Sequence, residues 1–159
     1  MNPTNPVNLG QCVMTNTESM IAAVEYRDGI MFKLRYISRH TLSKLSQSCL
    51  IWKFNDKTRV RQQQLDTERF AEEFCKKSVV GWEGVTPRKL ASLMPLDLTK
   101  VPVEQQDAEM PFDLANLLVM LKHAYDLDTF LQDNAVDIKV FRPGVEEELG
   151  NLPSSQTGT

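Results

Sequence analysis

The clearest pattern of apolar and polar positions lies near the amino-terminal end of the chain. Apolar and basic side chains alternate through Phe32, Lys33, Leu34, Arg35 and Tyr36, so a strand here has one apolar and one charged face. Asp28-Gly29 precedes this run, and Asp-Gly accepts the positive φ angles of a two-residue turn. We predict a hairpin of residues 21–26 and 30–37, packed on helices because an isolated hairpin is marginally stable.

From Arg39 onward the apolar positions follow the period of a helix. They recur three or four residues apart at Leu42, Leu45, Cys49 and Trp52, which places them on one helical face. Residues 55–57 interrupt the pattern. A second stripe follows, with Thr67 as its cap, at Phe70, Ala71, Phe74 and Cys75. The sequence therefore predicts two helices across this region.

A Gly-Trp-Glu-Gly stretch at residues 81–84 separates two apolar, helix-like segments. We predict a tight turn whose tryptophan, Trp82, is buried in the core. Thr86-Pro87 then has the capping hydroxyl and first-position proline of a helix start, and this short helix stops before Pro95.

The carboxyl-terminal half begins with a proline-bearing, acidic stretch over residues 95–111, which we predict to be an extended connector. Pro111 is expected to open the next helix. Its apolar face comprises Phe112, Leu114, Leu117, Leu118 and Leu121. After a break around residues 125–128, a further apolar face comprises Tyr125, Leu127, Phe130, Leu131 and Ala135.

These patterns predict an α+β fold with a mainly α-helical body and an amino-terminal β-hairpin packed on the helices. We expect residues 1–17 to be a flexible arm, since they are polar and have little apolar pattern. Residues 18–142 are expected to form a single globular domain, with the hairpin at 21–37 and the helical body at 39–142. Residues 143–159 have little to bury and are expected to be a disordered tail.

Composition and charge exclude several classes of protein. The chain has 159 residues, of which 42% are hydrophobic and 25% charged, values typical of one soluble domain. Its net charge of −3 is the wrong sign for a dedicated nucleic-acid binder. No apolar run suggests a membrane span, and no secretory signal pattern is present. Three widely spaced cysteines indicate a reducing compartment, so we expect a cytoplasmic protein.

The sequence shows no arrangement of residues typical of catalysis, of a cofactor site or of a metal site. Gly81–Gly84 lacks the lysine and hydroxyl of a phosphate-binding loop. His40 and His123 have no ligand partners at metal-site spacing. The spacing of Asp126 and Asp128 begins like a calcium loop, but Phe130 occupies the third ligand position. We therefore expect a non-catalytic protein with no cofactor.

Two segments together resemble the bacteriophage tail assembly chaperone family of long-tailed phages. The first comprises Val79, Val80, Gly81, Trp82, Glu83, Gly84 and Val85. The second comprises Pro111, Phe112, Asn116, Leu117, Leu118, Phe130 and Phe141. The overlap covers about residues 39–141. This chain departs from many members after the tryptophan, where it has Pro87-Arg88-Lys89 and a short helix instead of an Asp-Gly-rich turn.

The resemblance implies a protein of the bacterial host cytoplasm that binds the tape measure protein, helps recruit major tail tube subunits and is absent from the mature virion. Val80–Val85 would then form the scaffold. The candidate partner-binding residues are Phe112, Leu114, Leu118, Met120 and Leu121. Apolar helix stripes usually pack inward, so a purely structural role of Leu114–Leu121 stays open. Self-association, a structural virion component and a phage-encoded inhibitor of a host protein also stay open.

Overall fold

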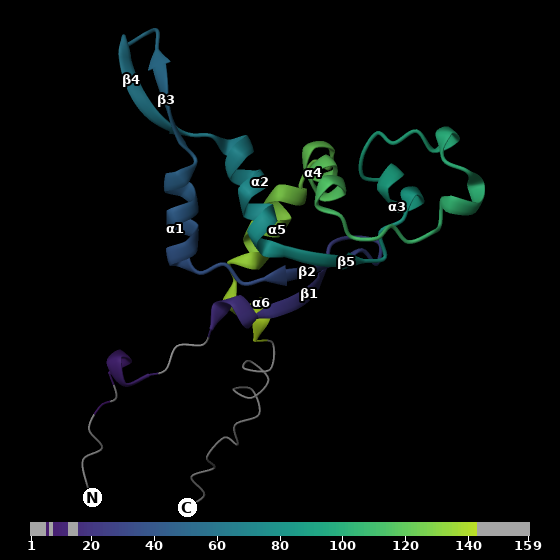
Figure 1. Ribbon diagram of the computed structural model, residues 1–159, viewed down its shortest axis with the longest axis horizontal. Helices are drawn as coiled ribbons and strands as arrows, with labels where there is room; N and C mark the ends of the chain where they lie inside the picture. Colours follow the sequence, from purple (N-terminus) through teal and green to yellow (C-terminus); the bar gives the residue numbers. More distant parts are fainter. Residues whose placement is uncertain (1–5, 7, 13–15, 143–159) are drawn as a thin grey trace, which may run out of the picture.

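Three antiparallel strands form the sheet at the centre of the fold, and helices surround it (Figure 1). The computed structural model describes residues 6, 8–12 and 16–142. The fold is mixed α+β, as the sequence predicts. Most of the expected arm, residues 1–17, and all of the expected tail, residues 143–159, lie outside the described residues.

The elements follow one another along the chain with short connections. The strands are β1 (Ile21–Glu25), β2 (Met31–Arg35), β3 (Leu50–Asn55), β4 (Val60–Leu65) and β5 (Val79–Glu83). The helices are α1 (Arg39–Ser48), α2 (Thr67–Ser78), α3 (Pro87–Ala91), α4 (Leu114–His123), α5 (Leu127–Ala135) and α6 (Ile138–Phe141). Short 3-10 turns lie at Leu9–Gln11, Thr17–Ser19, Leu98–Lys100 and Val103–Gln105.

The predicted amino-terminal hairpin is confirmed. β1 and β2 pair in antiparallel register, with Val24 opposite Phe32. Asp28 and Gly29 have φ angles of 51° and 77°, the positive values that a two-residue turn of this kind requires. The turn is closed by the Ile30 amide, which donates to the Arg27 carbonyl at 2.8 Å.

The central sheet gains its third strand from a distant part of the chain. β5 pairs with the free edge of β2, so the strand order is β1-β2-β5. Phe32 and Leu34 of β2 are fully buried on one face of the sheet, whereas Lys33 lies on the other face and pairs with Glu83 of β5 at 2.8 Å. The sheet therefore has an apolar face and a charged face, as its alternating sequence predicts.

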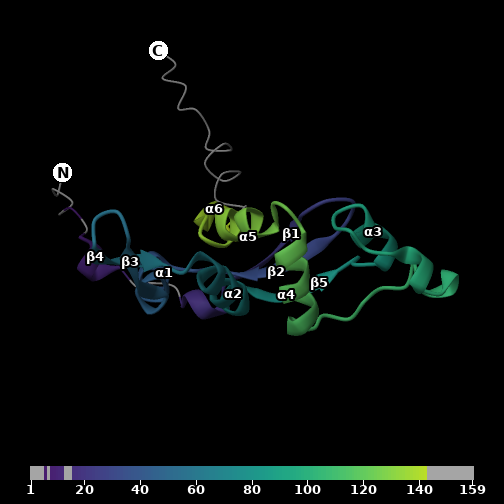
Figure 2. The ribbon, with the colours of Figure 1, turned by 90° about the horizontal axis from the view of Figure 1, so that it is seen from above.

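Helices α2 and α5 lie against the sheet, and α4 packs on both of them and completes the main core. In the view from above, α5 lies over one side of the sheet (Figure 2). Its buried side chains are Leu127 and Leu131, and α4 adds Leu117 and Met120 to the same cluster. A second, smaller cluster lies beside it and joins α1, α2 and the end of α5. It comprises Ile37, Leu45, Cys49, Phe70, Phe74 and Ala135.

Side-chain caps mark the starts of α1, α2, α3 and α4, and two of them differ from the predictions. Ser38 caps α1. Thr86 caps α3 with Pro87 in the first turn, as predicted. Asp66 caps α2, so Thr67 is the first helical residue and not the cap. Asp113 caps α4, so that helix begins at Leu114 and not at Pro111. The cap decides each start because it satisfies an amide that has no partner within the helix.

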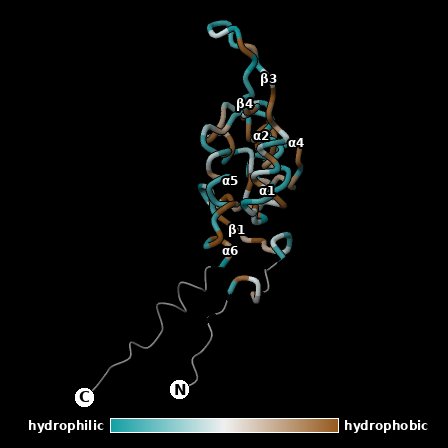
Figure 3. The backbone as a smooth tube through the Cα atoms, turned by 90° about the vertical axis from the view of Figure 1, so that its left-hand side faces the viewer, coloured by the Kyte–Doolittle hydropathy of each residue, from teal (hydrophilic) through white to brown (hydrophobic). Residues whose placement is uncertain are grey.

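Residues 50–65 are a β-hairpin, and the prediction that Trp52 continues a helical face is wrong. β3 and β4 pair along their whole length, from Leu50 opposite Leu65 to Asn55 opposite Val60. The Asp66 amide donates to the Cys49 carbonyl at 2.9 Å, which closes the base of the hairpin. The hairpin extends away from the helices in both side views (Figures 1 and 3). The expected helical body over 39–142 is thus interrupted here and again at β5.

The stretch between α3 and α4 is folded back on α3 and is not an extended connector. Two 3-10 turns shape it, and Gln106 donates from its side-chain amide to the carbonyls of Leu98 and Val101, at 3.1 Å each. The Arg88 amide donates to the Gln106 carbonyl at 2.9 Å, and the Arg88 guanidinium pairs with Asp107. The break predicted around residues 125–128 is confirmed, since α4 ends at His123 and α5 begins at Leu127.

Candidate functional site

The Gly-Trp-Glu-Gly stretch is a strand with a turn only at its end, so the predicted tight turn is wrong. Gly81, Trp82 and Glu83 belong to β5, with Trp82 opposite Phe32 of β2. Only Gly84 has a positive φ angle, 73°. The two preceding valines are β-branched and suited to a strand, and Val79 pairs with Leu34 on the open edge of β2. The register shifts at Val80. Trp82 is buried, as predicted, with 6% of its surface exposed.

Trp82 joins the two segments on which the resemblance to tail assembly chaperones rests. Its indole Nε1 donates to the Met110 carbonyl at 2.7 Å. Its ring meets Phe112 edge to face, with 5.1 Å between ring centroids. The Met110 amide donates to the Val85 carbonyl at 2.7 Å. Residues 79–85 and the residues at the start of α4 therefore form one unit, although they are far apart in the sequence.

Gly84 brings the two turns at one end of the sheet into contact. A Cβ atom at Gly84 would lie 2.5 Å from the Gly29 carbonyl oxygen, a distance that real Cβ atoms do not show. The Gly84 amide donates to Glu109 Oε1 at 2.8 Å. Glycine is thus required at residue 84 both by its φ angle and by this close approach. Gly81 differs, because a Cβ there would make only ordinary contacts with Lys33.

The candidate partner-binding residues on and before α4 do not all face the same way. Phe112 and Leu114 are exposed, and Leu118 and Leu121 are half-buried. The last two line a groove between α4 and α2. Met120 is different, because only 1% of its surface is exposed and it belongs to the main core. Its side chain is therefore not available to a partner in this conformation.

An apolar pocket lies on the other side of α4 and was not apparent from the sequence. It has a volume of about 230 Å³ and lies between α3, the folded stretch after it and α4. Its lining is almost wholly apolar and includes Leu90, Met94, Leu96, Val101, Met110 and Val119. The lining side chains come from three separate stretches, so no single periodicity could have indicated them. The pocket and Leu114 place exposed apolar surface on both sides of α4.

The most exposed aromatic side chains of the described chain after Tyr125 lie on the β3–β4 hairpin, a site that sequence reasoning missed. Trp52 is 65% exposed and Phe54 is 58% exposed. Leu50 and Leu65 are also exposed, and all four lie on the same face because residues two apart in a strand, and residues directly opposite each other, share a face. The alternation of Leu50, Trp52 and Phe54 is the signal that could have revealed this surface.

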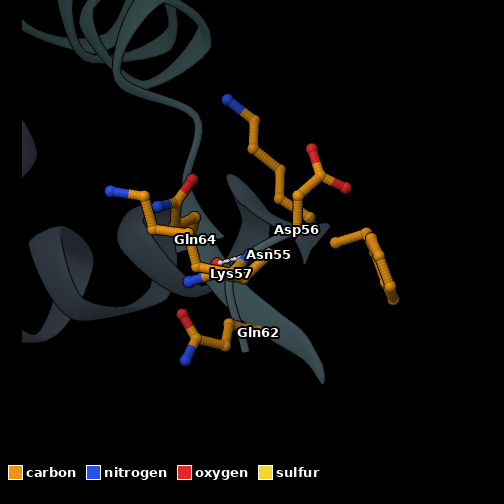
Figure 4. Close-up of a pocket in the computed structure, with 7 residues that line it drawn as sticks. Asn55, Asp56, Lys57, Gln62 and Gln64 are labelled. Carbon is orange, nitrogen blue, oxygen red and sulfur yellow. Dashed lines mark hydrogen bonds between the residues drawn. The ribbon is translucent and has the colours of Figure 1, made fainter. Parts of the chain in front are cut away.

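The opposite face of the hairpin is mainly polar, although Ile51 and Val60 also lie on it. A hollow near the turn is lined by Lys53, Asn55, Asp56, Lys57, Gln62 and Gln64, with Phe54 at its side (Figure 4). Asn55 Oδ1 accepts hydrogen bonds from the amides of Lys57 and Thr58 at 3.0 and 3.3 Å, which holds the turn. The hollow therefore contains two lysines and one carboxylate, Asp56, and no cluster of side chains suited to a metal or to acid–base chemistry.

Two groups inside the fold have strongly shifted pKa values, and both shifts have structural causes. Burial, together with a hydrogen bond from its hydroxyl to Asp126, raises the pKa of Tyr26 to about 12. Arg27 pairs with the same carboxylate. Burial raises the pKa of Cys75 to about 12. Both groups thus stay protonated at neutral pH, and the Tyr26 contact ties the first hairpin to the start of α5.

The described residues contain no group of three or more His, Cys, Asp and Glu side chains placed to hold a metal ion. His40 and His123 are both exposed. In the described part of the chain, no helix combines the length and the apolar character needed to cross a bilayer. Exposed apolar side chains lie on α4 and on the β3–β4 hairpin.

No protein-family model, curated protein or solved structure matches this chain.

Proposed function

We propose that this chain is a non-catalytic tail assembly chaperone of a long-tailed bacteriophage, which binds the tape measure protein in the host cytoplasm and helps recruit major tail tube subunits. One observation carries the proposal. The two segments that resemble the family pack against each other through Trp82, with Met110 accepting from its indole and Phe112 meeting its ring. Two short motifs that match a family independently are a weak resemblance. The resemblance is more specific when the matching residues also contact each other in the fold.

The exposed apolar side chains support binding of another polypeptide. A tape measure protein presents long amphipathic helices, and a groove or face with apolar anchors can cover such a helix. Phe112 and Leu114 are exposed, and Leu118 and Leu121 line a groove beside them. Leu117 and Met120 supply the fully buried contacts of α4 in the main core, whereas Leu121 packs against that core and keeps part of its surface exposed. Apolar surface is thus offered to a partner while the core remains closed.

The experiment that tests this proposal is deletion of the gene from the phage genome that encodes it. We expect lysates without assembled tails and with aggregated tape measure protein, and restoration of tails when the chain is supplied from a plasmid. Purified wild-type particles, analysed by mass spectrometry, should lack the chain. A fixed copy number in particles would instead identify a structural virion component, and normal tails after deletion would favour a protein that acts on the host.

A pair of substitutions tests the surface within the same experiment. Leu114 and Ile138 are exposed to almost the same extent, 39% and 40%, on α4 and α6. Leu114→Ser should reduce plasmid rescue and co-purification with the tape measure protein, because it removes an apolar anchor beside the proposed groove. Ile138→Ser should have no effect on either. Equal rescue by both variants would exclude α4 as the binding surface.

A further inference from the structure

The β3–β4 hairpin has an apolar face that nothing in the described chain covers. The face comprises Leu50, Trp52, Phe54 and Leu65, all of them exposed. β3 and β4 pair only with each other, and no third strand joins them among the described residues. A two-stranded hairpin in water is marginally stable, and it ordinarily needs a further strand or a helix packed on its apolar face. The helix or further strand that such a face ordinarily packs against is absent from the described residues.

The charge of the hairpin is opposite to that of the rest of the chain. Residues 50–65 contain Lys53, Lys57, Arg59 and Arg61 against the single carboxylate Asp56, which gives +3. Since the whole chain has a net charge of −3, the remaining residues sum to −6. None of the four cations forms an ion pair with another described residue. These unpaired charges favour an acidic partner over a basic one.

The positions of the apolar and charged groups favour a polypeptide over a nucleic acid or a lipid surface. Leu50 and Leu65 lie at the base of the hairpin with Trp52 next to them, whereas Lys57 and Arg59 lie in the turn. A strand that binds nucleic acid needs cations beside its stacking aromatics along the whole groove. A membrane-inserting hairpin needs an apolar tip, and here the tip is polar. On this face Trp52 lies opposite Gln63, and Phe54 lies opposite Arg61, so only one of the two aromatics has a cation beside it. The face is apolar at the base of the hairpin and cationic toward the turn.

We propose that this face docks an acidic amphipathic helix of a partner polypeptide. The apolar stripe of the helix lies across Leu50, Trp52, Phe54 and Leu65, and its acidic flank lies toward Lys57, Arg59 and Arg61. Each strand has six residues and so spans about 20 Å, the length of about 14 residues of α-helix. The inference deepens the proposed function and rests on it for the partner, whose tape measure helices would supply the segment.

Binding is tested on the full chain with two synthetic helical peptides of about 18 residues. Both have the same leucine stripe, but one has Glu and the other Lys on its polar positions. Trp52 reports contact directly, because its exposed indole should shift to shorter emission wavelengths when covered. We expect the Glu peptide to bind at least about tenfold more tightly than the Lys peptide, with an affinity that falls as salt is raised.

Three double variants locate the site, with affinities measured by calorimetry. Trp52→Ser with Phe54→Ser should weaken the Glu peptide at least about tenfold, since buried aromatic anchors dominate such contacts. Gln62→Ala with Gln64→Ala, on the polar face of the same hairpin, should leave its affinity unchanged. Lys57→Glu with Arg59→Glu should reverse the preference, so that the Lys peptide binds more tightly. Circular dichroism and melting temperature confirm that each variant folds.

Four outcomes would overturn the inference. The first is equal binding of both peptides, and the second is an unchanged affinity for the Glu peptide in the Trp52/Phe54 variant. The third is tighter binding of a single-stranded oligothymidine than of the Glu peptide. The fourth is self-association of the chain that is lost in the Trp52/Phe54 variant. The third would identify a nucleic-acid surface and the fourth a contact between copies. Peptide binding by a chain whose deletion leaves tails normal would refute the proposed function and leave this inference standing.

Discussion

The two tryptophans of the chain lie on strands and have opposite surroundings. Trp82 on β5 is 6% exposed, contacts Phe32 and Phe112, and donates its indole hydrogen to Met110. Trp52 on β3 is 65% exposed and belongs to neither apolar cluster. The central sheet has a helical layer on its apolar face, and the β3–β4 hairpin has none. The comparison separates the part of the chain that stabilises the fold from the part that is free to meet a partner.

The largest effect is expected from removing the buried tryptophan. Trp82→Ala should lower the free energy of unfolding by about 3–5 kcal/mol, because the truncation leaves a cavity and an unpaired Met110 carbonyl. Urea unfolding followed by circular dichroism measures the loss. Trp82→Phe retains most of the ring contacts without the hydrogen bond and should lose clearly less. A near-unchanged stability of Trp82→Ala would mean that the indole is a surface contact after all.

The two glycines that flank Trp82 and Glu83 should respond differently to alanine. Gly84→Ala is expected to cost about 1–3 kcal/mol, because it combines a φ angle of 73° with a Cβ only 2.5 Å from the Gly29 carbonyl oxygen. Gly81→Ala should cost less than about 1 kcal/mol, since its Cβ meets Lys33 at 3.5 Å. Thermal melts of both variants measure the two losses of stability. Equal losses would contradict the close contact between the turn at Gly29 and the turn at Gly84.

The Tyr26 contact between the first hairpin and α5 should weaken in alkali. The folded state holds the Tyr26 proton up to about pH 12, whereas the unfolded chain loses it near the ordinary value of 10. Its stabilising contribution is thus complete below pH 10 and is lost as the pH rises toward 12. Tyr26→Phe should cost about 1 kcal/mol at pH 7 through its lost hydrogen bond to Asp126.

The buried thiol of Cys75 also makes the free energy of unfolding fall as the pH rises above 9. The effect of Tyr26 is therefore measured as the difference in free energy of unfolding between the wild type and Tyr26→Phe. Urea unfolding at a series of pH values from 7 to 11.5 should show a shallower decline for the variant. Parallel curves for the two proteins would show that Tyr26 is accessible to solvent in the folded state.

The smallest effect is expected at the exposed tryptophan. Trp52→Ala should change the free energy of unfolding by less than about 0.5 kcal/mol, because its side chain is mostly exposed and belongs to neither apolar cluster. The same urea experiment applies. A loss above about 2 kcal/mol would show that the β3–β4 hairpin is a structural part of the fold, and the contrast between the two tryptophans would then disappear.

The sequence predicts the elements whose signal is local. Asp28-Gly29 specifies its turn through backbone preference alone, and Thr86-Pro87 specifies the start of α3 in the same way. β3 was missed because Leu42, Leu45, Cys49 and Trp52 also fit a helical spacing, which continues past the real end of α1 at Ser48. The sequence of β4 does not indicate a strand, because its run of three glutamines has neither an apolar period nor a high strand propensity.

The candidate site was only partly accessible to sequence reasoning, because it depends on contacts between distant residues. Burial of Trp82 follows from its residue type, but its bond to Met110 needs the path of the chain between them. Met120 lies one position before Leu121 and two after Leu118, yet it faces the core while both leucines face a groove. The rotation of α4 about its own axis decides this, and that rotation depends on how the helix packs on α2 and α5.

The hydrogen bond between the Asp66 amide and the Cys49 carbonyl means that the chain enters and leaves the β3–β4 hairpin at one point. Lengthening, shortening or exchanging the strands beyond that point alters no residue of either apolar cluster. The sixteen positions of residues 50–65 can therefore be exchanged as one unit, and the residues that form the two clusters stay the same.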